Sequence, residues 1–206
     1  MKKTITVLSV DYDYFIDVNE NRRQLMFPQG ADELTPEELK ERWGECYNKY
    51  PRLKRVLTHL TKLYQFSHYL YNQPEIDKDR VMTTTSHKYA KDFIDKNVPK
   101  DADLVIYNID HHHDYYHYHT KDNPCNCSNW LRLVLEERPN TKVVWICNNS
   151  SDTKTLEGEV PFEVTRSLGD LPESFDLLFM CSSPEWTPPH LLEHFDQLCA
   201  NIHLID

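Results

Sequence analysis

Apolar runs and amphipathic stretches take turns along this chain of 206 residues. Short runs rich in β-branched and aromatic residues predict buried strands, whereas apolar positions at helical spacing predict amphipathic helices. We expect strands at 4–10, 81–85, 104–109, 142–147, 162–165 and 175–181, with a short last strand at 202–204.

The first predicted helix carries the clearest start signal. Thr35 can cap it, Pro36 suits its first turn, and Glu38 completes a capping box. We expect this helix to reach about Tyr50 and a second helix to begin at Pro51. The second helix would have one apolar face, made of Leu53, Val56, Leu57, Leu60, Leu63 and Tyr64.

The rest of the chain continues the alternation. Further helices are expected at 88–97, after a Ser128 cap, and at 188–199, with loops at 16–34 and 148–158. Alternating strands and helices predict an α/β fold in which helices cover both faces of a mostly parallel sheet, that is, three layers α/β/α. The length suits a single domain spanning 1–206. Functional side chains should gather at the carboxyl ends of the strands.

Charge and composition argue against nucleic acids and membranes as partners. The net charge is −10, which argues against nucleic acid and is compatible with either a cationic substrate or simply an acidic surface. No apolar run approaches the ~20 residues that span a bilayer. The run 4–10 stops at Asp11, so a strand is favoured over a signal peptide. We therefore expect a cytoplasmic protein with no membrane partner, whose six cysteines stay reduced.

The strongest chemical signal follows the apolar run 104–109, where the sequence reads Asp110-His-His-His-Asp114. If the backbone stays extended, Asp110, His112 and Asp114 share one side and the other two histidines point away. Carboxylates beyond an apolar strand are costly to bury unless they are paired or bind metal. The alternative is a solvated, histidine-rich turn.

Two further pieces can complete a metal site. Asp11 and Asp13 follow the first strand with the same spacing of two, although such pairs also serve as caps or turns. His87 precedes a helix, where a histidine is more often structural. Together with the first cluster they offer four carboxylates and two imidazoles, a ligand set that suits two divalent cations such as Mn, Fe, Co or Zn.

At this point the motifs resemble the ureohydrolases of the arginase–deacetylase fold, and more closely the small arginase-like branch that contains the peptide arginases. The matching pieces span most of the chain. They are Val10-Asp-Tyr-Asp-Tyr-Phe15, Ser86-His87, Asn108-Ile-Asp-His-His-His-Asp114, Cys127-Ser-Asn-Trp130 and Ser183-Pro-Glu-Trp-Thr-Pro188.

The resemblance implies two Mn²⁺ ions, with other divalent metals as alternatives. One ion would be held by His87, Asp110, Asp114 and Asp11, and the other by His112, Asp110, Asp11 and Asp13. Asp114 would also orient the nucleophilic water. The reaction it implies converts arginine side chains of a ribosomally made precursor peptide into ornithine, with release of urea. That peptide would be the partner.

The chain departs from the familiar arginases in two ways. Their D-x-D strand follows the D-x-H-x-D strand in the chain, but here it comes first, so we expect an altered strand order. The segment 115–129 also replaces the loop that holds the α-amino and α-carboxylate groups of free arginine. This favours arginine within a peptide as the substrate.

The remaining catalytic candidates lie in two loops. Glu185 can bind a guanidinium bidentately, or it belongs to a helix-entry turn. His117 and His119 are candidate proton donors, or members of a solvated aromatic loop. Trp130 and Trp186 are candidates for the pocket wall, or for the core.

Several other functions stay open. One is a ureohydrolase or a mononuclear, deacetylase-like hydrolase acting on a small molecule, and another is a non-catalytic metal-binding protein. A zinc or redox site at Cys125 and Cys127 is the least favoured, because one intervening residue is poor spacing for either. The oligomeric state is not predicted.

Overall fold

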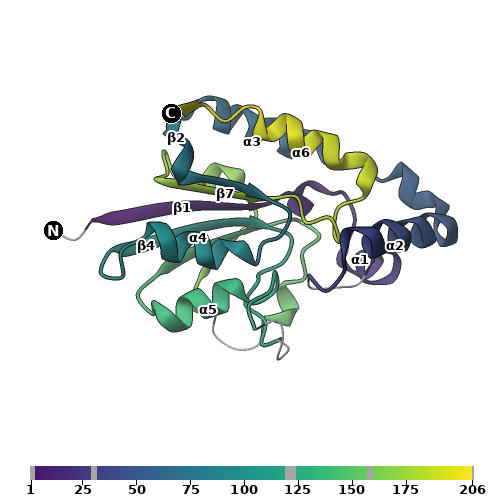
Figure 1. The fold of residues 1–206 in the computed structure, drawn as a ribbon, viewed down its shortest axis with the longest axis horizontal. Coiled ribbons are helices and arrows are strands. Elements are labelled where there is room, and N and C mark those ends of the chain that lie inside the picture. Colours follow the sequence, from purple (N-terminus) through teal and green to yellow (C-terminus); the bar gives the residue numbers. More distant parts are fainter. Residues whose placement is uncertain (1–2, 29–31, 119–123, 157–159, 206) are drawn as a thin grey trace.

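The computed structural model describes residues 3–28, 32–118, 124–156 and 160–205. Its centre is a six-stranded sheet in which every neighbouring pair is parallel (Figure 1). The strand order is β3 (Val81–Thr84), β7 (Leu177–Cys181), β1 (Thr4–Asp11), β4 (Asp103–Asp110), β5 (Lys142–Cys147) and β6 (Glu163–Thr165). The predicted parallel α/β architecture is therefore confirmed.

The first strand of the chain lies in the middle of the sheet. β1 pairs with β4 through Val10 and Ile109, and with β7 through Asp11 and Cys181. This register brings the carboxyl ends of β1 and β4 level. Asp11 and Asp110, the last residues of those two strands, therefore emerge side by side at one edge of the sheet.

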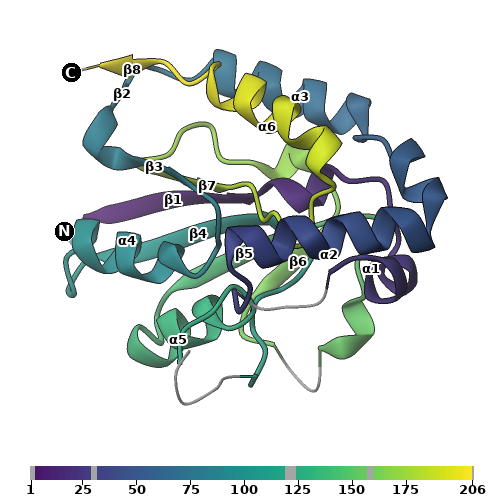
Figure 2. The same cartoon turned by 45° about the vertical axis from the view of Figure 1, so that its right-hand side comes forward.

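Helices cover both faces of the sheet, as Figures 1 and 2 show. Along β1 the apolar side chains alternate: Leu8 and Val10 join one buried cluster, while Ile5 and Val7 join another. The first cluster receives side chains from α2 (Pro36–Lys49), α3 (Leu60–Tyr71) and α6 (Leu192–Cys199), and the second receives them from α4 (Tyr89–Asn97) and α5 (Trp130–Glu137). This gives the three layers that the alternation predicted.

The start of α2 is as predicted. The Thr35 hydroxyl accepts a hydrogen bond from the Glu38 backbone N–H, and the Glu38 carboxylate accepts one from the Thr35 N–H. The capping box therefore satisfies donors that helix geometry leaves unpaired.

The prediction of a loop over 16–34 was wrong in part, because it contains helix α1 (Glu20–Met26). Asn19 caps this helix by accepting a hydrogen bond from the Arg22 N–H. The only residue that α1 buries fully is Arg23. The helix therefore has no apolar face from which the sequence could predict it.

The predicted helix from Pro51 onward is interrupted. A 3₁₀ turn, η2 (Pro51–Arg55), is followed by an extended stretch in which Thr58 pairs with Ile16. The backbone N–H groups of Asp17 and His59 donate to the carbonyls of Leu57 and Phe15, and these bonds hold the segment extended. The single apolar face was therefore wrong in part: Leu57, Leu60 and Tyr64 are exposed, whereas Leu53 is buried and Val56 and Leu63 pack against the core. The apolar residues that α3 buries are Phe66 and Leu70.

Smaller differences lie at the ends of elements. The last strand, β8 (Leu204–Ile205), pairs with β2 (Ile76–Asp77) in a separate two-stranded sheet. Asn129 rather than Ser128 occupies the cap position of α5. The remaining 3₁₀ turns are η1 (Tyr12–Phe15), η3 (Lys78–Arg80), η4 (Thr153–Thr155), η5 (Leu168–Asp170) and η6 (Pro189–Leu191). Within the described ranges, no helix is both long enough and apolar enough to span a bilayer.

Candidate metal centre

Three loops at the carboxyl edge of the sheet bring the predicted metal ligands together. The β1–η1 junction carries Asp11 and Asp13, the loop after β3 carries His87, and the end of β4 leads into the segment with the remaining ligands. Nitrogen and oxygen atoms of these residues form two neighbouring groups with the spacing of metal ligands. They are His87, Asp110 and Asp114, and Asp13, Asp110 and His112.

The first group surrounds one nitrogen of His87. Its Nδ1 lies 3.0 Å from Asp114 Oδ2, 3.2 Å from Asp110 Oδ2 and 3.5 Å from Asp11 Oδ2. On the other side of the ring, Nε2 lies 2.7 Å from the Ser9 hydroxyl, so the ring is oriented from within β1. Although three carboxylates are close, Nδ1 has hydrogen-bond geometry with no described residue.

The second group lies around His112. Its Nδ1 is 3.2 Å from Asp13 Oδ2, and Asp110, shared with the first group, is the third member. The Asp110 Oδ1 accepts a hydrogen bond from the His112 backbone N–H at 2.8 Å. Asp110 therefore stands between the two groups and belongs to both.

Turns, rather than continued extended backbone, direct these side chains. Asp11 accepts a hydrogen bond from the Asp13 N–H at 3.0 Å and caps the 3₁₀ turn η1. Asp114 has φ of 50°, in the left-handed region that few residues except glycine enter easily, and its Oδ2 accepts from Trp130 Nε1 at 2.6 Å. Such strain is commonly stored at functional sites.

The expected alternation of the histidines was therefore wrong for one of them. The ring of His111 lies beside that of His112, with centroids 4.9 Å apart, instead of pointing away. His113 does turn aside and stacks on Tyr116. The strand ends at Asp110, so a period of two no longer applies beyond it.

Burial makes the group of carboxylates electrostatically strained. Desolvation raises the pKa of Asp110 well above its usual value, and the neighbouring Asp114 raises it further. Desolvation and Asp13 also raise the pKa of Asp11. Burial alone would lower the pKa of His87, but the surrounding carboxylates raise it well above normal. These shifts indicate an excess of negative charge that bound cations would compensate.

The donor set fits divalent metal ions. Buried carboxylate oxygens surround His87 Nδ1, which has no hydrogen bond to any described residue, and a second imidazole faces the shared Asp110. Carboxylate and imidazole ligands without thiolates suit borderline and hard divalent ions. The thiol of Cys181 also lies near Asp11 and His87, but burial raises its pKa and keeps it protonated.

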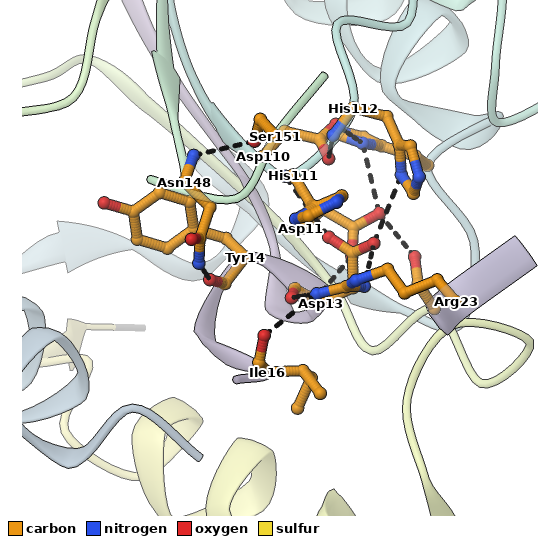
Figure 3. A network of polar contacts seen from close by, with 12 residues as sticks. Asp11, Asp13, Tyr14, Ile16, Arg23, Asp110, His111, His112, Asn148 and Ser151 are labelled. Carbon is orange, nitrogen blue, oxygen red and sulfur yellow. Dashed lines mark hydrogen bonds and ion pairs between the residues drawn. The ribbon is translucent and has the colours of Figure 1, made fainter. Parts of the chain in front are cut away.

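Arg23 of α1 is a buried cation that the sequence did not reveal. Its Nη1 lies 3.0 Å from Asp13 Oδ2, and Nη2 donates to the carbonyls of Asp13 and Ile16 (Figure 3). Its Nε donates to the carbonyl of Val18. Burial alone would raise the pKa of Asp13, but Arg23 and His112 together lower it. Asp13 is therefore held ionised without any metal.

Glu20, also on α1, was likewise missed. Its Oε2 lies 2.9 Å from His111 Nε2 and 3.4 Å from His112 Nε2. Burial alone would raise the pKa of Glu20, but its bonds to the two histidines lower it strongly.

A cavity of about 440 Å³ opens beside the cluster. Trp186 is part of its wall and lies 4.8 Å from the His112 ring, centroid to centroid. Trp130 is instead fully buried, behind His87. The other walls include Asp11, Glu20, Asp114, Tyr116 and Tyr118.

Neither His117 nor Glu185 lines this cavity. His117 is exposed, with its ring 6.5 Å from that of Tyr115. His119 lies outside the described residues. Glu185 lines a neighbouring groove of about 710 Å³, where burial raises the pKa of its carboxyl to about 7. Trp43 of α2 fixes this loop by donating to the Pro184 carbonyl at 2.7 Å.

Cys125 and Cys127 make unrelated contacts. The Cys125 thiol donates to the Lys88 carbonyl, whereas the Cys127 backbone N–H donates to Asp32. Burial raises the pKa of Cys125 to about 11 and that of Cys127 well above normal. Neither environment favours the thiolate that zinc binding or redox chemistry needs.

Comparison of the chain with protein-family models, with curated proteins and with solved structures finds no match. We therefore infer the function from the geometry of the site and from the resemblance of its motifs.

Proposed function

We propose that this chain is a binuclear, manganese-dependent hydrolase that converts arginine side chains within a peptide into ornithine and urea. The observation that carries the proposal is the position of Asp110, which belongs to two adjacent ligand groups. One histidine, His87 or His112, stands in each group, and Asp11, Asp13 and Asp114 complete the ligands. The resemblance to peptide arginases assigns these six residues to two Mn²⁺ ions.

Each side chain has a role that follows from its place. Asp110 would bridge the two cations, while Ser9 holds the His87 ring so that Nδ1 faces them. Asp114, oriented by Trp130, would align the attacking water by accepting its hydrogen bond. When bound, a pair of divalent cations lowers the pKa of a shared water and polarises the bond that breaks.

The surroundings of the cluster favour a cationic side chain presented by a peptide. Glu20 and Asp152, which are not among the proposed metal ligands, add acidic side chains to the cavity wall and suit a guanidinium. The adjacent groove, lined by Trp43, Tyr47 and other apolar residues, offers room for residues beside the arginine. Glu185 lines this groove and stays our candidate for holding the guanidinium. His117 stays the candidate proton donor.

The described cysteines also bear on where the reaction takes place. All six carry free thiols. We place the reaction in the cytoplasm, where such thiols stay reduced.

Incubation with substrate tests the proposal. Manganese-loaded protein would be mixed with free arginine, with an arginine-containing peptide and with an acetyl-lysine peptide. We expect urea only from the arginine peptide, whose mass falls by that of one cyanamide unit for each ornithine formed, since water is added and urea leaves. Asp110→Asn should abolish the reaction while leaving the protein folded.

Other results would assign a different function. Acetate release from the acetyl-lysine peptide would identify a deacetylase-like hydrolase. Binding of two manganese ions without turnover of any of the three substrates would contradict the arginase assignment.

A further inference from the structure

The two ring nitrogens of His112 lie near two different carboxylates. Nδ1 lies 3.2 Å from Asp13 Oδ2, and Asp13 and Asp110 form a group of possible metal ligands with His112. Nε2 is buried and has no hydrogen bond to any described residue, and the nearest carboxylate oxygen given for it is Glu20 Oε2 of helix α1, at 3.4 Å. Glu20 Oε2 also lies 2.9 Å from His111 Nε2, and Glu20 forms a further group of possible ligands with the two histidines. It is not a member of the group that contains the shared Asp110.

An imidazole binds a cation through only one nitrogen, so the other must carry its proton toward an acceptor. The acceptor fixes the tautomer and the ring orientation, and a charged acceptor makes the ligating nitrogen more basic. We propose that Glu20 is a positioning residue, which holds His112 with Nδ1 directed at the cation shared with Asp13 and Asp110. This inference rests on the metal-binding part of the proposed function and not on the substrate.

The positions of Glu20 and its neighbours on helix α1 place its carboxylate beside His112. Glu20 is its first residue, and Arg23 lies three positions later on the same face. Glu20 therefore lies against His112, while Arg23 forms an ion pair with Asp13. One short helix thus contacts two of the proposed ligands of the second cation. Gln24 in turn fixes the Glu20 carboxylate by donating to its Oε1 at 2.6 Å.

The first cation position has a different partner. The outer nitrogen of His87 is hydrogen-bonded to the neutral hydroxyl of Ser9 at 2.7 Å. A change at Glu20 should therefore weaken the second position and spare the first. That selectivity separates a positioning role from a general effect of charge or folding.

Manganese titration of the metal-free protein, followed by calorimetry, tests this inference. In Glu20→Ala we expect the second binding step to weaken about 10- to 100-fold, as for other outer partners of metal-bound histidine. The first step should not change. Glu20→Gln keeps a neutral acceptor, so its loss should be smaller. Glu33→Gln is the matched control, because exposed Glu33 contacts Tyr118 of the cavity wall and no described histidine.

A second readout follows the proton itself. In ¹⁵N-labelled, zinc-loaded protein, the His112 ring should show a slowly exchanging N–H at Nε2. We expect this signal in the wild type and in Glu20→Gln, and its loss in Glu20→Ala. A merely structural role for Glu20 would leave the signal in place.

Three results would overturn the inference: unchanged affinities in Glu20→Ala, equal weakening of both steps, or an Nε2 proton that persists without Glu20. Failure of the proposed function looks different. In that case the protein binds two cations with the expected selectivity but releases no urea from an arginine peptide.

Discussion

Among single residues, Asp110 concentrates both the chemistry and the electrostatic strain of the site. Asp110 is almost fully buried. Burial and then the neighbouring Asp114 raise its pKa, because its negative charge is neither solvated nor fully balanced by a nearby cation. Side chains that are arranged to bind a ligand often lower the stability of the ligand-free protein. Removing the charge should therefore cost function and increase stability.

We predict that Asp110→Asn unfolds at a higher temperature than the metal-free wild type. Asparagine keeps an oxygen for the His112 N–H but removes the buried charge. A gain of about 1 kcal/mol corresponds to roughly 2–4 °C in a protein of this size. Thermal unfolding in EDTA measures it, and a lower unfolding temperature for the variant would contradict the account.

Arg23 should behave in the opposite way. Arg23→Met leaves Asp13 buried without its cation, and breaking a buried pair from one side costs about 3–5 kcal/mol. The double variant with Asp13→Asn should regain part of this loss, but not all, because three backbone carbonyls still lose their donor. Urea denaturation of the metal-free proteins measures both values, and additive losses would show that the pair is not coupled.

Among the elements, the sequence predicted those whose signals are local. The β-branched run before Asp11 and the apolar run before Asp110 identified two strands at the centre of the sheet. The convergence of their carboxyl ends then followed from the parallel architecture. The capping box at Thr35 located α2 for the same reason, since its chemistry lies within one turn.

Elements that depend on distant contacts were not predictable. The break in the chain before α3 exists because Thr58 pairs with Ile16, far away in the sequence. Helix α1 turns polar side chains inward, so hydrophobic periodicity could not find it. Glu20 and Arg23 were missed along with their helix, whereas the ligands at strand ends were found.

The capping box provides a prediction for an element. Thr35→Ala removes the side-chain acceptor for the Glu38 N–H and should destabilise the protein by about 1 kcal/mol. Glu41→Ala, on an exposed face of the same helix, should change stability by less than about 0.5 kcal/mol. Chemical denaturation compares the two variants, and equal effects would argue against the cap.

For the whole molecule, metal binding and folding should be linked. The ligands come from β1, the loop after β3 and the end of β4, so only the folded chain assembles them. A ligand that binds only the folded state at 100 times its Kd stabilises it by about 2.7 kcal/mol. We predict that manganese raises the unfolding temperature of the wild type and that EDTA reverses the effect. Asp110→Asn should show little response, and an equal response in both proteins would place the metal elsewhere.

Anomalous diffraction from a manganese-soaked crystal tests the metal centre most directly. We predict two anomalous peaks roughly 3.5–4 Å apart. One should contact His87, the other His112, and both should contact Asp110. Peaks confined to exposed carboxylates, with none between these side chains, would contradict the account.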